Sequence, residues 1–182
     1  MAIVTVEKGL SADVIRTLSA HKKEPKWMLD MRLKAFNHFI NQPTPKWGNT
    51  ELLEAINFED ICYFNVVGKN EDDWNNVSDD VKDTFEGIGI PEAEQKWLGG
   101  VTAQYDSESI YHSIRADLVA QGVIFMDMDT GLREHPEIVK EYFGKVISYA
   151  DNKFSSLNTA FWSGGSFIYV PKGVKVEIPV QA

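Results

Sequence analysis

The C-terminal stretch, residues 164–182, constrains the fold of this chain more than any other part of the sequence. Two runs of alternating apolar residues, 166–170 and 174–180, flank a turn-forming Pro-Lys-Gly at 171–173. Proline fixes φ at the start of a turn and glycine readily supplies positive φ, so the pattern predicts a strand, a tight turn and a second strand. Because two strands alone are only marginally stable in water, we expect them to open a larger β-structure.

Amphipathic helices are predicted in the first part of the chain. Ser11 stands at an N-cap position ahead of an apolar stripe, which predicts a helix over 11–21. Pro25 is tolerated at the first position of a helix, and the apolar residues after it recur every three or four positions, which predicts a helix over 25–41. The two prolines and the glycine of residues 42–49 predict a loop after it.

Short helices and short strands are predicted to alternate in the middle of the chain. Asp106 and Ser107, between alternating flanks, predict a hairpin over 101–112. The other predicted elements are a helical turn over 50–56, a partly buried extended segment over 56–67, a helix capped by Ser78 and ending at 87–89, a helix over 91–98, a helix through Leu118 that ends at Gly122, a strand over 123–128, a helix from His135 and Pro136 to Gly144, and a helix over 151–162 capped by Asp151.

Composition and charge narrow the class of protein. The chain has 182 residues, 43% hydrophobic and 12% aromatic, which supply enough large apolar side chains for a folded globular domain. Its formal net charge of −9 argues against nonspecific nucleic-acid binding, which depends on Lys and Arg neutralising phosphates. A single cysteine permits no intrachain disulfide, and no stretch resembles a signal sequence or a membrane span. We therefore expect a cytoplasmic protein that binds neither nucleic acid nor membranes.

The segment V-I-F-M-D-M-D-T-G-L, residues 123–132, is the strongest candidate for catalytic chemistry. A buried strand ending in D-x-D is typical of haloacid-dehalogenase-type phosphatases, in which Asp127 would be the nucleophile and Asp129 the acid/base beside a magnesium ion. The residues that follow lack the lysine and the second acidic pair that such a phosphohydrolase needs. The alternative is a strand end and a helical turn with two solvated carboxylates, and we favour this alternative.

The other reactive side chains also have structural explanations. Metal-binding spacing is absent among the four histidines, His21, His38, His112 and His135. Cys62 lies in an apolar run, where a buried free cysteine behaves as a small hydrophobic residue, and Ser163 lacks the surroundings of a nucleophilic serine. The acidic residues 71–73 and 79–80 are expected to be solvated. The residues by themselves therefore predict no catalytic, cofactor-binding or metal-binding site.

Several strings of residues, in one order and spacing, extend over nearly the whole chain. They are GLSADVIRTLSAHKKEPKWMLDMRLKAF (9–36), GIPEAE (89–94), AQYDSE (103–108), QGVIFMDMDT (121–130), HPEIVKEYFGKVI (135–147), DNKFSSLNTA (151–160) and WSGGSFIYVPKGVKVEIPVQA (162–182). In these strings the sequence resembles the SufB scaffold proteins of the SUF system, which assembles iron-sulfur clusters. The resemblance extends far beyond a short motif.

The resemblance implies an α+β chain. An N-terminal mixed helical and α/β region over 1–162 would lead, at 163–182, into the first strands of a right-handed parallel β-helix. The implied function is that of a non-enzymatic scaffold component in iron-sulfur cluster assembly, with the paralogue SufD, the ATPase SufC and a cysteine desulfurase as partners. Family members are much longer, and their cluster ligands would lie beyond Ala182. No site residue or cofactor is therefore expected in this chain alone.

A free-standing interaction module that docks on the SUF complex is the alternative to a scaffold fragment. If neighbouring coils of the β-helix are missing, the apolar residues of the two predicted C-terminal strands would form an exposed edge prone to self-association. The residues of this predicted edge are Phe167, Tyr169, Val174, Val176, Ile178 and Val180.

Overall fold

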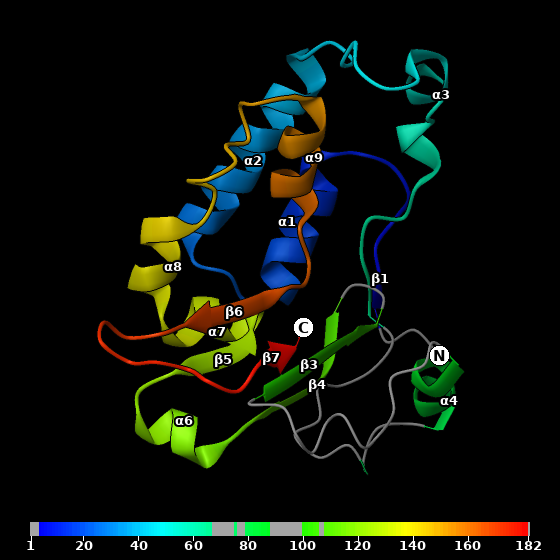
Figure 1. Ribbon diagram of the computed structural model, residues 1–182. Helices are drawn as coiled ribbons and strands as arrows, with labels where there is room; N and C mark the ends of the chain where they lie inside the picture. The colour runs from blue at the N-terminus through cyan, green and yellow to red at the C-terminus, as the bar shows by residue number, and fades with distance from the viewer. Residues whose placement is uncertain (1–3, 67–74, 76–78, 88–99, 106–107, 182) are drawn as a thin grey trace. The chain divides into compact units, whose positions relative to one another are not determined.

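The computed structural model describes residues 4–66, 75, 79–87, 100–105 and 108–181 (Figure 1). The elements, in chain order, are β1 (Val4–Thr5), α1 (Ala12–His21), α2 (Lys26–Asn41), α3 (Thr50–Glu54), η1 (Phe58–Asp60), β2 (Asn65–Val66), α4 (Asp79–Gly87), β3 (Gly100–Tyr105), β4 (Glu108–Ile114), α6 (Ala116–Ala120), β5 (Ile124–Asp127), α7 (Met128–Glu134), α8 (Pro136–Tyr142), α9 (Lys153–Phe161), β6 (Ser166–Tyr169) and β7 (Val180–Gln181). This mostly helical fold with small sheets has the mixed α and β content that the sequence predicts. The predicted helix over 91–98 and the predicted cap at Ser78 lie outside the described residues.

The chain forms two compact units, each built from segments far apart in the sequence. The helical unit consists of residues 4–65 and 132–163, and the strand unit of residues 1–3, 66–131 and 164–182. The domain boundary predicted between residues 162 and 163 of this chain stays a prediction. Within the described part of the chain, no helix has the length and apolar character needed to cross a membrane.

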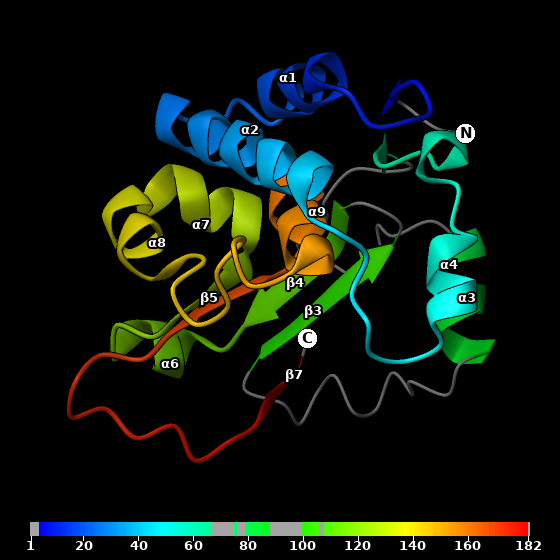
Figure 2. The same cartoon turned by 90° about the horizontal axis from the view of Figure 1, so that it is seen from above.

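Helix α2 is the centre of the helical unit, and both α1 and α9 pack against it (Figure 2). Its buried residues are spaced by three or four positions and so lie on one face: Met28, Arg32, Ala35 and Phe39. Burial of each large apolar side chain contributes about 1.5–3 kcal/mol to stability. The helix predicted over 25–41 is confirmed, although Pro25 is its N-cap rather than its first helical residue.

Side-chain caps determine where α1 and α9 begin. Ser11 Oγ accepts a hydrogen bond from the Val14 N–H at 3.1 Å, which confirms the cap predicted for α1. The cap of α9 is Asn152 rather than the predicted Asp151, because the Asn152 side chain accepts from two N–H groups of the first turn. Ser155 Oγ accepts in return from the Asn152 N–H, which completes a capping box.

The segment 56–67 is not the partly buried, extended segment that its apolar content predicts. The Asn57 side chain accepts from the Glu59 N–H and begins η1, and residues 56–62 are exposed or half-buried. Asparagine competes for backbone N–H groups in this way, so a turn forms here in place of a strand. Strand-like pairing resumes where the Val6 N–H donates to the Phe64 carbonyl at 3.3 Å.

Strands β3 and β4 of the strand unit form the antiparallel hairpin predicted over 101–112. Gly100 pairs with Ile114 at the open end of the hairpin, and the register shifts once, next to Ala103. Such a shift is a β-bulge, which increases the local twist. The turn residues 106–107 lie outside the described residues.

The C-terminal strands pair with earlier strands rather than with each other. Strand β6 is antiparallel to β5, and β7 is parallel to β3. Residues 170–179 belong to no strand. The strand predicted over 166–170 is confirmed, whereas the one predicted over 174–180 is wrong except at its last residue. No coil of a parallel β-helix occurs among the residues that the structure describes, which corrects that part of the predicted fold.

Close packing at Gly131 accompanies the pairing of β6 with β5. A Cβ atom on Gly131 would lie 2.7–2.9 Å from three side-chain carbons of Phe167, closer than packed carbon atoms approach. Phe167 is only 9% exposed, so it does not belong to the exposed edge predicted for the C-terminal strands. The exposed apolar side chains in this stretch are instead Ile168 and Val170, at 46% and 42%.

Candidate functional site

The D-x-D segment, residues 127–129, lies at the junction of β5 and α7. Asp127 is only 9% exposed, and its Oδ1 accepts a hydrogen bond from the Thr130 N–H at 2.9 Å. The carboxylate therefore satisfies a backbone donor in the first turn of α7, where the helix dipole also favours negative charge. The predicted strand end and helical turn are confirmed, whereas the predicted solvation of Asp127 is wrong.

The remaining candidate residues contribute to the fold. No group of three or more His, Cys, Asp or Glu side chains in the described part of the chain could hold a metal ion. Cys62 is exposed, which corrects its predicted burial, and its Sγ lies 3.5 Å from the Val6 carbonyl and 3.4 Å from the Phe64 carbonyl. Ser163 offers its backbone carbonyl, which accepts a hydrogen bond from Lys22 Nζ.

The four histidines lie on separate elements, α1 (His21), α2 (His38), β4 (His112) and the N-cap of α8 (His135). Two of them pack edge-on against aromatic rings, with centroid separations of 5.5 Å to Phe64 and 5.0 Å to Tyr149. Among the acidic residues, 71–73 lie outside the described residues, and the side chain of Asp79 is 96% exposed as predicted.

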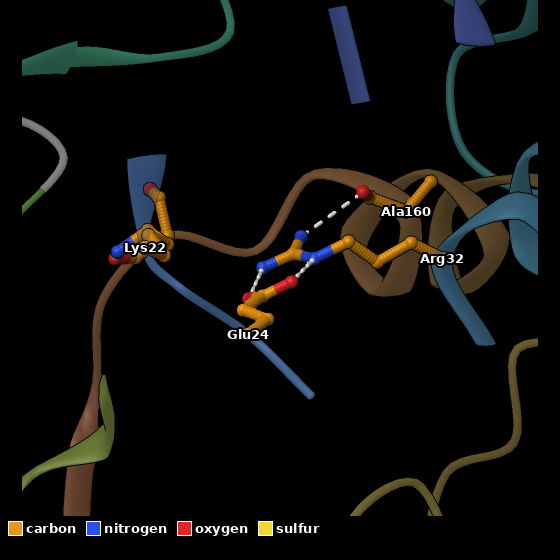
Figure 3. A network of polar contacts seen from close by, with 5 residues as sticks. Lys22, Glu24, Arg32 and Ala160 are labelled. Atoms are coloured by element: carbon orange, nitrogen blue, oxygen red, sulfur yellow. Dashed lines mark hydrogen bonds and ion pairs between the residues drawn. The ribbon is translucent and has the colours of Figure 1, made fainter. Parts of the chain in front are cut away.

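The best-defined polar cluster in the helical unit surrounds Arg32 (Figure 3). Its guanidinium makes two parallel hydrogen bonds to the Glu24 carboxylate, one of them from Nε at 2.8 Å, and Nη1 donates to the Ala160 carbonyl at 3.0 Å. The side chains of Arg32 and Glu24 are completely buried. A buried ion pair is favourable only when its hydrogen bonds are satisfied, and this two-pronged geometry satisfies them.

Trp162 packs against this ion pair. The guanidinium carbon of Arg32 lies 4.5 Å from the centroid of the indole, which is within cation–π range. Lys22 Nζ lies 5.9 Å from the same ring and 5.3 Å from the ring of Phe64. The indole N–H is buried, and no acceptor among the described residues satisfies it, so contacts with its faces hold the ring. We call Glu24, Arg32, Ala160 and Trp162 the arginine cluster.

The turn between α1 and α2 places Glu24 beside Arg32. Lys23 has a φ of +54°, and its N–H donates to the Ala20 carbonyl at 3.1 Å. The Glu24 N–H donates to the Ser19 carbonyl at 3.0 Å. These two hydrogen bonds are those of a Schellman motif, which ends α1 and turns the chain towards α2.

The burial of Arg32 was not predicted from the sequence, although the position of Arg32 on α2 indicates it. Arg32 lies four residues after Met28 and three before Ala35, so it shares the face of α2 that is otherwise apolar. A charged side chain on a buried face has to be paired. Glu24, just before the helix, is the acidic residue that pairs with it.

Lys153 caps the C-terminal end of α2. Its Nζ donates to the Phe39 and Gln42 carbonyls at 3.2 Å and 3.0 Å, and lies 4.5 Å from the centroid of the Phe39 ring. Backbone carbonyls at a helix C-terminus lack intrahelical partners, and a lysine can satisfy them. Lys153 begins α9 and Ala160 lies near its end, so polar contacts fix both ends of the packing between α2 and α9.

The chemistry of these groups favours a structural role. Nε, Nη1 and Nη2 of Arg32 all donate hydrogen bonds to groups of the protein itself. Burial, with a smaller contribution from the negative charge of Glu59, raises the pKa of Tyr63 to about 12. The Tyr63 hydroxyl therefore stays protonated at neutral pH, and it donates to the Phe58 carbonyl at 3.0 Å.

Comparison with known proteins gives the family of the chain. A family model described as the SufBD protein N-terminal region matches residues 15–182. The chain belongs to the SufBD family. It is 50% identical to the iron-sulfur cluster assembly protein SufB of Bacillus subtilis (strain 168), with all of this chain and 39% of that protein covered. It is 56% identical to an iron-sulfur cluster assembly SufBD family protein of Mycobacterium tuberculosis (strain ATCC 25618 / H37Rv), with 22% of that protein covered.

A third SufBD relative, from Staphylococcus haemolyticus (strain JCSC1435), is 49% identical, with 39% of that protein covered. This SufBD chain therefore spans well under half the length of these curated relatives. The resemblance found from the sequence strings is confirmed at the level of the family and its N-terminal region.

Proposed function

We propose that this chain is the N-terminal region of a scaffold component for iron-sulfur cluster assembly, and that it is not itself an enzyme. The proposal is carried by the family match over 15–182, together with the relatives, which are named for iron-sulfur cluster assembly. On this proposal the cluster is the cargo of the whole scaffold, which acts in the cytoplasm. SufD, the ATPase SufC and a cysteine desulfurase are its partners, and none of the residues of this chain is assigned to them.

The part of the scaffold represented here would supply a stiff support. Two observations favour this role: the completely buried pair of Arg32 and Glu24, and the cap that Lys153 places on α2. On this proposal most of the parallel β-helix is formed by residues of the longer relatives that this chain does not span. Residues 174–180 would join it only when a neighbouring coil provides hydrogen-bond partners, as solenoid repeats require.

A chimera tests the scaffold assignment. This chain replaces the matching 183 residues of Bacillus subtilis SufB, and the chimera is produced in cells depleted of their own SufB. The chimera is expected to restore the activity of iron-sulfur enzymes in these cells, and to take up iron and sulfide anaerobically in the same ratio as SufB. A folded, monodisperse chimera that does neither would contradict the proposal.

The isolated chain provides a second test. Under the same anaerobic conditions it is expected to bind no stoichiometric cluster, and Cys62→Ala is expected to change nothing. Visible iron-sulfur absorbance that disappears in Cys62→Ala would contradict this expectation. Capture of the isolated chain at a 1:1 ratio by SufB, SufD and SufC would instead favour the alternative of a free-standing docking module.

A phosphatase assay tests the non-enzymatic assignment. No magnesium-dependent hydrolysis of a generic phosphate ester is expected, because the buried Asp127 carboxylate caps α7. Turnover that Asp127→Asn abolishes would overturn the assignment. Thr130→Ala is the matched control, because it alters a neighbouring side chain and keeps the backbone N–H that Asp127 binds.

A further inference from the structure

Residues 46–61 of the helical unit form a segment that we call the acidic arm. It contains α3 and η1, and none of its residues is buried. Four of its large apolar side chains are exposed, namely Trp47 (57%), Leu52 (67%), Ile56 (36%) and Ile61 (39%), whereas Leu53 and Phe58 are half-buried. Four of the eleven large apolar side chains that are exposed in the described part of the chain lie within these sixteen residues. Contiguous exposed apolar surface is a mark of interaction sites.

Hydrogen bonds within the acidic arm give it a defined local shape. Asn49 Oδ1 accepts from the Leu52 N–H at 3.2 Å and begins α3. Asn57 Oδ1 accepts from the Glu59 N–H at 3.2 Å and begins η1. Both of these hydrogen bonds are formed within the arm itself.

Aromatic contacts attach the acidic arm to the helices of its unit. The ring of Phe58 lies 5.2 Å from that of Phe39 and 6.4 Å from that of Phe154, between centroids. Trp47 lies 6.0 Å from Phe154 and still exposes more than half of its surface. The arm is thus held in place before anything binds it, which lowers the entropy lost on binding.

The charged residues of the acidic arm are mostly negative. Its only basic residue is Lys46, and its acidic residues, all exposed, are Glu51, Glu54, Glu59 and Asp60, so its net charge is −3. Within the described part of the chain, none of these four carboxylates takes part in an ion pair. The nearby donors are polar but uncharged, such as the Leu10 N–H, 3.4 Å from Glu59, and the Asn57 amide, 3.0 Å from Asp60.

We propose that the acidic arm docks a basic amphipathic segment of a partner protein. Large apolar side chains of that segment would cover Trp47 and Leu52, and its Lys or Arg side chains would pair with Glu51 and Glu54. Charge complementarity of this kind speeds association and suppresses wrong partners. Nucleic acids and anionic membranes, being negatively charged, would be repelled. The proposal does not depend on the scaffold function.

Binding of a synthetic peptide tests the surface directly. The probe is a fluorescently labelled amphipathic helix of leucine and lysine, and the control peptide has glutamate in place of each lysine. The chain is expected to bind the leucine–lysine peptide at a 1:1 ratio, more weakly as salt is raised. The leucine–glutamate peptide should not bind. Equal binding of both peptides would overturn the proposal.

Matched variants locate the binding site. Glu51→Lys combined with Leu52→Ser should weaken binding of the leucine–lysine peptide about tenfold, the equivalent of about 1.4 kcal/mol. Glu137→Lys combined with Val146→Ser makes the same changes at exposed positions outside the arm, and should leave the affinity within about twofold. Equal losses in both variants would mean that overall charge attracts the peptide, and would overturn the proposal.

Two further measurements decide between the remaining outcomes. Circular dichroism confirms that each variant is folded. If the variant that combines Glu51→Lys with Leu52→Ser is unfolded, Glu54→Lys replaces it as the arm variant. Sedimentation velocity measures self-association of the chain without peptide. Self-association that the arm substitutions abolish would overturn the proposal, because the occupant would then be a second copy of this chain.

Discussion

Lys23 has a left-handed backbone conformation, with a φ of +54°, at the end of α1. Glycine is the usual residue at this position of a Schellman motif, because it has no Cβ to clash with the following carbonyl oxygen. For other residues the left-handed conformation costs roughly 1–2 kcal/mol. The hydrogen bonds that turn the chain towards α2 offset this cost.

Lys23→Gly is expected to stabilise the protein by about 0.5–1 kcal/mol, which is less than the full cost because glycine also loosens the unfolded chain. The free energy of unfolding, measured with urea at neutral pH, checks this. Lys23→Ala keeps the Cβ atom and is the matched control, with an expected change of a few tenths of a kcal/mol. A destabilised Lys23→Gly would mean that contacts of the lysine side chain outweigh the backbone strain.

Ionisation of the Tyr63 hydroxyl makes the stability of the protein depend on pH in alkaline solution. Its pKa is about 12 in the folded protein, first because of burial and second because of the charge of Glu59. The ordinary tyrosine pKa is about 10, so the folded protein holds this proton more tightly than the unfolded chain. The stability that Tyr63 contributes is therefore complete below about pH 10 and is lost as the pH rises towards 12.

The wild-type protein is expected to lose more stability than Tyr63→Phe when the pH rises from about 9 to 11, because phenylalanine has no proton to lose. Urea unfolding of both proteins at the two pH values measures the difference. Glu59→Gln removes only the smaller cause of the pKa shift and should reduce the loss in part. An identical loss in wild type and Tyr63→Phe would refute this assignment.

Among the elements, α1, α2 and α9 meet at the arginine cluster. Glu24 follows α1, Arg32 lies on α2, and Ala160 and Trp162 lie at the end of α9. The ion pair is completely buried, so removal of one charge leaves the other without compensation in a medium of low dielectric constant.

Arg32→Met is expected to lower the free energy of unfolding by about 3–5 kcal/mol, because it strands the Glu24 carboxylate in the core. Arg32→Lys should also be strongly destabilising, because an ammonium cannot reproduce the two-pronged hydrogen bonding. Combining Arg32→Met with Glu24→Leu should restore most of the loss. Urea denaturation of the single and double variants gives the coupling energy.

The matched control for this prediction is the exposed ion pair of Arg16 with Asp13 on α1. Its side chains are 55% and 93% exposed, so Arg16→Met should cost less than about 1 kcal/mol. A double variant no more stable than Arg32→Met alone would argue against the unpaired carboxylate as the source of the loss.

Elements that depend on near neighbours in the chain could be predicted from the sequence. The helices over 11–21 and 25–41 follow from an N-cap, a proline and a helical period, all of which act over a few residues. The hairpin over 101–112 follows in the same way from its alternation. The segments 56–67 and 174–180 are also apolar, but the first forms a capped turn and most of the second joins no strand.

At the scale of the whole molecule, the sequence did not predict which strand pairs with which. Alternation shows which side chains share a face of a strand, but it does not show which strand lies beside it. Strand β6 therefore looked like the start of a pair with 174–180, whereas it pairs with β5 and places Phe167 against Gly131. Each unit likewise combines distant segments, so no boundary in composition marks it.

The same distinction between local and distant contacts applies to the candidate site. The strand end and the helical turn at D-x-D were predictable, because they depend on local pattern, but the burial of Asp127 depends on what packs around it. Arg32 had a visible signal in its spacing, yet its pairing with Glu24 needed the turn that Lys23 makes. The exposure of most of residues 56–61 could not be read from the apolar content of the segment 56–67, which predicted partial burial.

The sequence by itself determined the main helices, the hairpin and the SufBD family, because caps, periodicity and ordered strings are properties of residues close together in the chain. Only the tertiary structure decided that β6 pairs with β5, that a charged pair lies in the core between helices, and that residues 46–61 stay on the surface. The physical reason is that hydrogen-bond partners, burial and exposure depend on segments distant in sequence, and those segments meet only when the chain has folded.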